Sequence, residues 1–367
     1  MTAPLTPLVA GLPATVPFVG PEAQERDRGR PFKARIGANE SVFGPSPLAV
    51  EAMQRAAPEM WMYCDPDNHD LRMALAAHHR VAPESIVIGE GIDGLLGYTV
   101  RLFIEPGASV VTSAGAYPTF NYHVTGFGGE LVTVPYRHDT EDPEALAEAA
   151  RASGARLVYI ANPDNPMGTW HGAERISRLI EAMPEGCLLC LDEAYIEFAP
   201  EDTAPEWDTS DPRVIRFRTF SKAHGLAGLR IGYAIAAPET AAAFNRVRNH
   251  FGVSRMAQIA ALAALGDEAH LASVQAGVAA ARIRIGEIAA ASGLACLPSA
   301  TNFVAIDCGA DGDFARRVLA GLLARDIFVR MPGTAPQDRC IRISAGRGRE
   351  LDLLAAALPA ALADAKS

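Results

Sequence analysis

Short apolar runs alternate along the first two thirds of the chain with stretches in which apolar residues recur every three or four positions. The apolar runs predict buried strands, and the stretches with the longer period predict amphipathic helices. We expect strands at residues 85–89, 109–112, 130–135, 156–161, 187–191, 214–217 and 230–236. We expect helices between them at residues 92–103, 143–151 and 174–183. This alternation is typical of an α/β fold with a mainly parallel sheet.

The pattern changes after about residue 238, where longer, alanine-rich helical stretches occupy residues 240–249 and 270–292. Predicted strands at 302–307, 327–330 and 341–344 then alternate with predicted helices at 312–324 and 347–363. The first thirty residues are rich in proline and charge, which indicates an extended arm. We therefore predict a large domain over residues 45–249 and a smaller α+β domain over 250–367, against which an arm of residues 1–44 packs.

Composition narrows the classes of function. The chain has 367 residues, 49% of them hydrophobic, and a formal net charge of −10, which argues against a nucleic-acid partner. No apolar run approaches the roughly 20 residues that span a bilayer, and residues 1–20 do not resemble a secretory signal. The six cysteines are dispersed, and Cys187 and Cys190 would point to opposite faces of one strand. We expect reduced thiols, a cytoplasmic protein and no metal site.

The segment from Ser221 to Arg230 brings a hydroxyl, the amine of Lys222 and a guanidinium together between glycines. Such a set suits a ligand that carries both a carbonyl and a phosphate. Pyridoxal phosphate is one, because its aldehyde forms a Schiff base with an amine and its phosphate needs hydrogen-bond donors. The alternative is a surface loop with two cations.

Two further turns follow predicted strands. Gly91 lies between a strand and a helix, so the helix start at Ile92 and Asp93 offers free N–H groups to a phosphate. Tyr117 precedes a proline just beyond another strand, where ligands bind in sheets of this type. The alternatives are a turn needed only for close packing at Gly91 and an ordinary turn at Tyr117.

Two polar residues follow the next strands. Prolines on either side stiffen the loop that carries Asn165, which suits an amide held toward a ligand. Asp192 ends an apolar run, where an unpaired carboxylate would cost several kcal/mol. A protonated pyridine nitrogen would satisfy this carboxylate, and would make the ring an electron sink. The alternative for Asp192 is a cap at the end of the strand.

Two arginines lie in apolar segments near the C-terminus. Arg342 is the second residue of the predicted strand 341–344, and Arg330 ends the predicted strand 327–330. A guanidinium in such a place needs an anion, and its planar fork fits a carboxylate or a phosphate. Each could instead form an ion pair within the protein.

These motifs, in this order, resemble the fold-type I aminotransferases that depend on pyridoxal phosphate, and among them the histidinol-phosphate aminotransferase group. The resemblance implies a large domain with a seven-stranded sheet, a small C-terminal domain and a homodimer. It makes Lys222 the catalytic residue, which holds the cofactor and moves a proton. Its other implied assignments concern the cofactor and the substrate. The cofactor set is Gly91, Ile92, Asp93, Tyr117, Asn165, Asp192, Tyr195, Thr219, Ser221, Arg230 and, from the neighbouring subunit, Tyr63, and the substrate set is Arg342, Arg330 and Asn39.

The resemblance also implies a reaction in which the amino group of histidinol phosphate passes to 2-oxoglutarate. The chain departs from the family at Phe18, where relatives often carry a tyrosine that contacts the substrate phosphate. An aromatic or broad-range amino acid aminotransferase therefore remains an alternative. A lyase or decarboxylase that uses the same cofactor is a further one. A non-catalytic regulator on this fold would need a DNA-binding module, for which the arm is too short.

Overall fold

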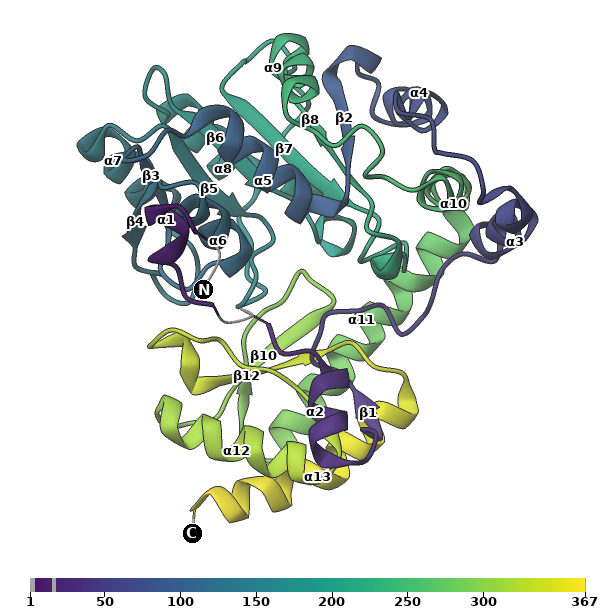
Figure 1. The fold of residues 1–367 in the computed structure, drawn as a ribbon. Coiled ribbons are helices and arrows are strands. Elements are labelled where there is room, and N and C mark those ends of the chain that lie inside the picture. Colours follow the sequence, from purple (N-terminus) through teal and green to yellow (C-terminus); the bar gives the residue numbers. More distant parts are fainter. Residues whose placement is uncertain (1–3, 15–17, 367) are drawn as a thin grey trace.

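A seven-stranded sheet forms the centre of the larger part of the molecule (Figure 1). The computed structural model describes residues 4–14 and 18–366. The strands run in the order β2 (Ile86–Gly89), β8 (Gly232–Ile235), β7 (Val214–Thr219), β6 (Leu188–Asp192), β5 (Leu157–Ala161), β3 (Ser109–Ser113) and β4 (Glu130–Val134). β8 is antiparallel to both of its neighbours, and every other pairing is parallel. The prediction of a mainly parallel α/β sheet is confirmed.

Helices cover both faces of this sheet, which explains why the inner strand β5 is buried along its whole length. Val110 and its neighbour Val111 on β3 point into different cores, because successive side chains alternate between the two faces. One core contains α5 (Gly91–Phe103) and α6 (Pro118–Gly126). The other contains α7 (Pro143–Ser153) and α8 (Ala173–Ala182).

A further layer of helices lies beside β2 and β8. It consists of α3 (Pro47–Ala56), α4 (His69–His79) and α10 (Arg255–Leu265), and α10 packs on both of the others. The predicted domain boundary at residue 249 thus lies before α10, which packs with the large sheet domain. The three predicted domain ranges remain a prediction. The predicted helix 240–249 is wrong. α9 covers only Pro238–Ala243, and the fully buried Phe244 begins a 3-10 turn that ends at Arg246.

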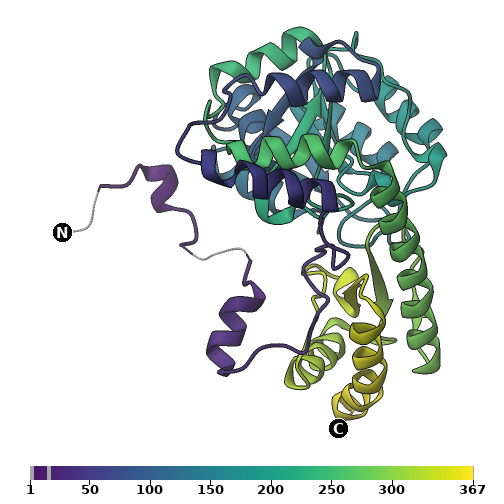
Figure 2. The same ribbon diagram turned by 90° about the vertical axis from the view of Figure 1, so that its right-hand side faces the viewer.

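The smaller part contains an antiparallel sheet in the order β12 (Cys340–Ser344), β10 (Phe303–Asp307) and β9 (Ala295–Cys296). Three helices pack against it, namely α11 (Glu268–Ala291), α12 (Gly312–Ala324) and α13 (Gly348–Lys366). α11 runs from the large part into the small one (Figures 1 and 2). Short 3-10 turns lie at Ala57–Glu59, Pro83–Ser85, Ile196–Phe198, Glu201–Thr203, Ala227–Leu229 and Gln337–Arg339.

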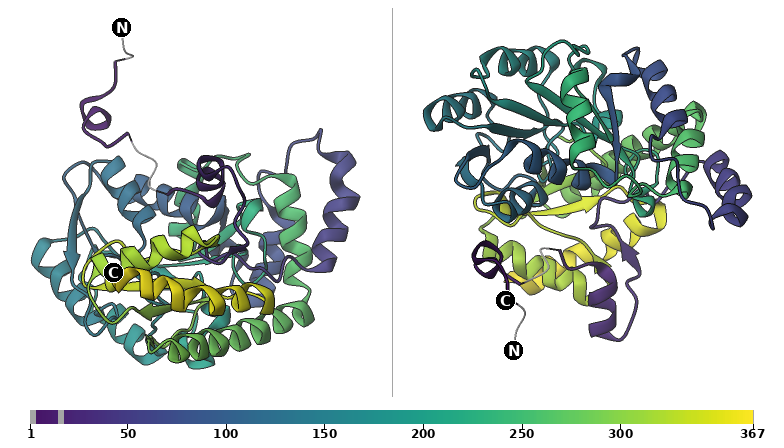
Figure 3. Two further views of the ribbon diagram at one scale, coloured as in Figure 1. Left: turned by 90° about the horizontal axis from the view of Figure 1, so that it is seen from below. Right: turned by 45° about the horizontal axis from the view of Figure 1, so that its top comes forward.

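The N-terminal arm is not simply extended, as the sequence predicted. It contains α1 (Pro7–Ala10) and α2 (Pro21–Arg28), and each begins with a proline, which favours the first turn of a helix. β1 (Ala34–Arg35) pairs in parallel with β11 (Ile327–Phe328), which joins the arm to the small sheet region. α1 stands away from the rest of the molecule (Figures 2 and 3).

One carboxylate anchors the arm to the small part. Asp326 forms ion pairs with Arg28, Arg30 and Lys33, at 2.9 Å to Arg30 Nε and 3.1 Å to Lys33 Nζ. These partners lower the pKa of Asp326 against the opposing effect of burial. Among residues 4–14 and 18–366, no helix is long and apolar enough to cross a membrane.

Candidate active site

A cavity of about 720 Å³ lies at the carboxyl ends of the central strands, between the large part, the small sheet and the arm. Thirteen of the fifteen residues that the sequence predicted for the site line it; they are Asn39, Ile92, Asp93, Tyr117, Asn165, Asp192, Tyr195, Thr219, Ser221, Lys222, Arg230, Arg330 and Arg342. Gly91 does not line the cavity, although the next residue, Ile92, does. Tyr63 does not line the cavity, and its side chain is 79% exposed.

Lys222 follows β7 on a loop that turns back at Gly225. Its Nζ donates a hydrogen bond to the backbone oxygen of Asn39 at 3.2 Å, and Nζ lies 5.4 Å from the centre of the Tyr195 ring. Gly225 has a φ of +68°, and a Cβ there would lie 2.3 Å from the oxygen of Gly44. The loop thus packs against the segment after Asn39 so closely that only glycine fits, and the amine is held at the cavity wall.

Asp192 ends β6 and faces the cavity from a buried position. Its Oδ2 accepts a hydrogen bond from the Tyr159 hydroxyl at 2.7 Å, and its Oδ1 accepts one from the Ala194 N–H at 3.0 Å. Burial raises the pKa of Asp192 to about 6, although both hydrogen bonds and the positive charge of Lys222 act in the opposite direction. A cationic partner in the cavity would restore a fully ionised carboxylate.

Donors for an anion converge beside Lys222. The hydroxyl of Thr219 lies 3.0 Å from that of Ser221, and Arg230 Nη1 lies 3.4 Å from Ser221 Oγ. α5 begins at Gly91, and the residue before it supplies no side-chain cap, so the first N–H groups of the helix remain available. Gly91 has a φ of +77°, and a Cβ there would lie 2.6 Å from Arg230 Nη2. This group of hydroxyls, guanidinium and helix N-terminus is suited to a phosphate.

An aromatic ring lies next to these donors. The Tyr117 hydroxyl donates to Asp93 Oδ1 at 2.7 Å, and Asp93 Oδ2 lies 3.3 Å from Arg230 Nη2. Burial and the negative charge of Asp93 raise the pKa of Tyr117, so its hydroxyl stays protonated. The ring of Phe18, from the arm, stacks near Tyr117 with centroids 6.4 Å apart. The arm therefore contributes directly to the cavity wall.

The two predicted substrate arginines lie side by side, because Arg330 and Arg342 pair as an isolated antiparallel bridge. Arg342 Nη1 donates to Asn165 Oδ1, whereas its buried Nε has no hydrogen-bond partner. Burial lowers the pKa of Arg342 from its ordinary value, yet an arginine remains a cation. Arg330 Nη2 donates to the Val19 backbone oxygen of the arm at 2.9 Å. Arg342 thus offers unsatisfied donors to an anion in the cavity.

Asn39 lies where the large part, the small sheet and the arm meet at the cavity. It adopts a left-handed conformation with φ of 55°. Its Nδ2 donates to the Tyr195 hydroxyl at 3.0 Å, and its N–H donates to Ser344 Oγ at 2.9 Å. Together with the bond from Lys222, these contacts join the large part to β12 of the small sheet.

Sequence reasoning missed Tyr159 and Ser344. Tyr159 lies in the centre of the buried strand β5, two residues before Ala161, which pairs in register with Asp192. The sequence does contain a clue to Tyr159, namely a tyrosine in an otherwise apolar strand. A buried hydroxyl of this kind needs a hydrogen-bond partner. Ser344 gave no comparable signal, since its contact with Asn39 spans 305 positions of sequence.

Comparison with known proteins gives the family. The model for class I and II aminotransferases matches residues 33–358. The chain belongs to this family. It is 35% identical over 359 residues to a histidinol-phosphate aminotransferase of Anaeromyxobacter sp. (strain Fw109-5), covering 96% of this chain and 97% of the relative. It is 37% identical over 331 residues to histidinol-phosphate aminotransferase 1 of Mesorhizobium japonicum, covering 89% of each.

Among solved structures, the chain resembles the histidinol-phosphate aminotransferase of Sinorhizobium meliloti in complex with pyridoxal 5'-phosphate. The TM-score is 0.96 and the sequence identity 56%, over 99% of this chain and 98% of the other. This aminotransferase therefore belongs to the histidinol-phosphate aminotransferase branch of its family, which confirms the resemblance drawn from the sequence.

Proposed function

We propose that this chain is a pyridoxal phosphate-dependent aminotransferase that transfers the amino group of histidinol phosphate to 2-oxoglutarate. The observation that carries the proposal is the convergence of one amine, one buried carboxylate and one phosphate cradle on a single cavity. Lys222 supplies the amine, Asp192 the carboxylate, and Ser221 with Arg230 the cradle.

The residues of the cavity fit the cofactor. Asp192 is a buried carboxylate whose pKa is raised by burial, so it calls for a cationic partner such as a protonated pyridine nitrogen. Gly91 has no side chain where one would clash with Arg230, which keeps the helix N-terminus open to a phosphate. Tyr117 presents an aromatic ring to the same cavity. When bound, pyridoxal phosphate supplies an aldehyde that takes up the substrate amine and a ring that draws electrons from the substrate carbon.

The chain's own groups divide the remaining work. Thr219, Ser221 and Arg230 would bind the phosphate of the cofactor, and Asp192 would keep its ring nitrogen protonated. The Tyr195 hydroxyl oxygen accepts a hydrogen bond from Asn39, so the hydroxyl can still donate one to the cofactor. With the cofactor bound, the Nζ of Lys222 would accept a proton from the substrate carbon and donate it to the carbon of the cofactor's aldehyde group, and the Asn39 backbone oxygen would orient that nitrogen.

Arg342 would bind the anionic end of each substrate in turn. Asn165 orients it, because its Oδ1 accepts from Nη1. The amide N–H groups of Asn165 would then donate to an oxygen of the cofactor. The buried, unpartnered Nε of Arg342 supports this role. Arg330 would add a second positive charge next to it, and Asn39 would close the same end of the cavity. We expect phosphate in one half-reaction and a carboxylate of the 2-oxo acid in the other.

We further propose a homodimer in which Tyr63 completes the phosphate site of the neighbouring subunit. Tyr63 and Trp61 are 79% and 82% exposed, and the Tyr63 ring lies 4.9 Å from that of Phe251, which is itself 51% exposed. An exposed aromatic patch of this kind is typical of an interface. Light scattering tests the dimer, and a Tyr63→Phe variant should bind pyridoxal phosphate more weakly. We also propose a cytoplasmic location, because all six cysteines are free thiols.

The visible absorption spectrum of the purified holoenzyme tests the proposed substrate. Histidinol phosphate and phenylalanine are added separately, without 2-oxo acid, and the absorption of the cofactor bound to Lys222 is followed. We expect histidinol phosphate to abolish that absorption and 2-oxoglutarate to restore it, with formation of glutamate. A response to phenylalanine alone would favour the aromatic alternative, which Phe18 suggests because it lacks a hydroxyl. Release of ammonia or carbon dioxide would instead indicate a lyase or a decarboxylase.

A further inference from the structure

Two acidic side chains lie buried behind the wall that carries Asn165. Glu141 precedes α7 and is 1% exposed, and Asp164 lies in the loop after β5 and is 2% exposed. The two carboxyl groups lie within hydrogen-bonding reach of each other, and each affects the pKa of the other. Neither was singled out by the sequence, and the reaction proposed above uses neither.

Every oxygen of the pair also accepts a hydrogen bond from a neutral donor. Ser113 Oγ donates to Glu141 Oε2 at 2.5 Å, and the Ala161 N–H donates to Oε1 at 2.9 Å. The Tyr136 hydroxyl donates to Asp164 Oδ1 at 2.8 Å, and the Met167 N–H donates to Oδ2 at 2.9 Å. Two ionised carboxylates cannot bond to each other, so the contact between them requires one proton. Burial of each group and the charge of its partner raise the pKa of Glu141, and burial also raises that of Asp164.

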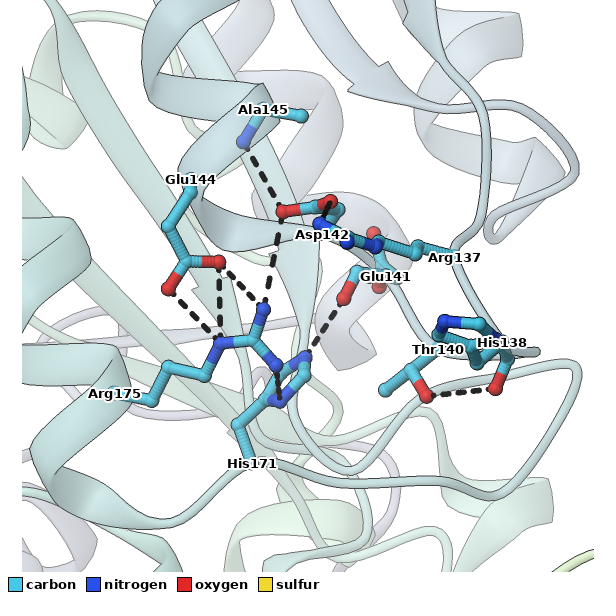
Figure 4. A network of polar contacts seen from close by, with 9 residues as sticks. All are labelled: Arg137, His138, Thr140, Glu141, Asp142, Glu144, Ala145, His171 and Arg175. Carbon is cyan, nitrogen blue, oxygen red and sulfur yellow. Dashed lines mark hydrogen bonds and ion pairs between the residues drawn. The ribbon is translucent and has the colours of Figure 1, made fainter.

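The charged side chains next to Glu141 form hydrogen bonds and ion pairs with one another. The backbone oxygen of Glu141 lies 2.8 Å from His171 Nε2, and His171 Nδ1 lies 3.1 Å from Arg175 (Figure 4). Arg175 is bound by Glu144 and lies 3.8 Å from Asp142. Burial lowers the pKa of His171, so this ring adds no charge near neutral pH. Burial raises the pKa of Tyr136 and that of Tyr159, so both are neutral, and the cation that acts on Asp164 is Arg342.

Asp164 also shapes the turn that carries Asn165. Its side chain accepts from Met167, its backbone oxygen accepts from Gly168 at 3.1 Å, and its N–H donates to Thr169 at 2.8 Å. These three bonds close the loop in which Asn165 projects toward Arg342. No ion pair between Arg342 and a carboxylate occurs within residues 4–14 and 18–366, so the pair acts on this cation at a distance.

We infer that Glu141 and Asp164 share a single proton and act together as positioning residues. They hold Asn165 and the guanidinium of Arg342 in the orientation that binds the carboxylate of the 2-oxo acid. With one proton, the pair carries one negative charge, which offsets the positive charge of Arg342 without occupying its fork. This inference rests on the proposed function, because it assigns a support to the proposed anion site.

The test compares Asp164→Ala, Asp164→Asn and Thr112→Val as holoenzymes. Thr112 is the matched control, because it lies on β3 beside Ser113 and its buried hydroxyl has no partner. Binding of succinate, a dicarboxylate that cannot accept an amino group, is measured by calorimetry at pH 7 and pH 9. Steady-state kinetics with 2-oxoglutarate give KM and kcat separately.

Asp164→Ala should weaken succinate binding and raise KM for 2-oxoglutarate about tenfold, the effect of losing roughly one hydrogen bond to a charged group, with a smaller change in kcat. Asp164→Asn should restore binding at pH 7, because its amide donates permanently to Glu141 and the Tyr136 hydroxyl can accept. It should also lose less affinity between pH 7 and pH 9 than the wild type, in which the shared proton dissociates as the pH rises. Thr112→Val should behave as the wild type.

Two results would overturn the inference. The first is an Asp164→Ala variant whose KM and succinate affinity match those of Thr112→Val. The second is an Asp164→Asn variant with the same pH dependence as the wild type, and this second comparison stands even if Asp164→Ala does not fold. A wild-type holoenzyme that neither binds succinate nor transfers an amino group would instead contradict the proposed function itself.

Discussion

The Tyr159 hydroxyl gives the most direct test of how the fold sets the charge of Asp192. It donates to Asp192 Oδ2 at 2.7 Å, and Tyr159→Phe removes it while keeping the ring. That ring stacks on Phe120 with centroids 4.5 Å apart, so the variant preserves the packing of the core. The perturbation is therefore confined to one hydrogen bond on a buried carboxylate.

The size of the effect follows from the energy of that bond. A hydrogen bond to a charged group contributes about 1.5–3 kcal/mol, and about 1.4 kcal/mol corresponds to one pKa unit. The bond stabilises the ionised form, so its loss favours protonation. We expect the pKa of Asp192, about 6 in the wild type, to rise by about one to two units in Tyr159→Phe.

The assay is the dissociation constant of pyridoxal phosphate from the apoprotein, followed by absorbance between pH 5 and pH 9. If a protonated ring nitrogen needs ionised Asp192, affinity falls as the pH drops through the pKa of this carboxyl in the free protein. Titration of the cofactor is common to all variants, so the difference between variants isolates Asp192. Tyr233→Phe is the matched control, since its hydroxyl lies 2.8 Å from His79 Nε2 instead.

The decisive result is the position of the break in that profile. A shift to higher pH in Tyr159→Phe, with none in Tyr233→Phe, supports the assignment of Asp192 as the partner of the ring nitrogen. Coincident profiles in the wild type and Tyr159→Phe would refute it, because the hydroxyl could then have no influence on the ionisation that binding requires.

Three other predictions concern neighbouring residues. Lys222→Ala should abolish turnover while retaining some cofactor binding, because the cradle of Ser221 and Arg230 remains; a fully active variant in the coupled assay would remove Lys222 from the mechanism. Gly91→Ala should weaken pyridoxal phosphate binding about tenfold or more, because its Cβ would displace Arg230. Gly107→Ala has the same backbone strain at φ +85° and open space around it, so equal weakening in both would contradict the reasoning. Arg342→Lys should raise KM for 2-oxoglutarate about tenfold with little change in kcat, because an ammonium cannot form two parallel hydrogen bonds; an unchanged KM would exclude Arg342 from the anion site.

The sequence predicted the parts of the fold and site that short segments encode. Buried parallel strands are continuously apolar, and a polar residue placed just after one, such as Asp192 or Lys222, is recognisable without knowledge of the tertiary structure. Even so, a proline-rich segment predicts an extended arm, whereas the prolines at positions 7 and 21 begin α1 and α2. The predicted helix 240–249 ended early for a similar reason, since periodicity could not show that Phe244 turns into the core.

Contacts between distant segments could not be predicted in this way. Tyr159 bonds to Asp192 because β5 and β6 pair in a register that brings Ala161 beside Asp192. The Glu141–Asp164 pair forms because the segment before α7 contacts the loop after β5. From the sequence alone, each of the two residues is expected to be an exposed carboxylate. The chemical groups were visible in the sequence, but their partners depend on strand order and register.

Asn39 shows what this long-range assembly adds to the site. Its backbone oxygen accepts from Lys222, its amide donates to Tyr195, and its N–H donates to Ser344 on β12, two positions from Arg342. Its left-handed backbone, which asparagine tolerates better than most residues, directs the oxygen and the N–H to different parts of the molecule. A displacement of β12 on binding a substrate anion would therefore move the acceptor of the Lys222 amine as well. The anion site and the reacting nitrogen are thus linked through a single residue, because Asn39 contacts both Lys222 and Ser344.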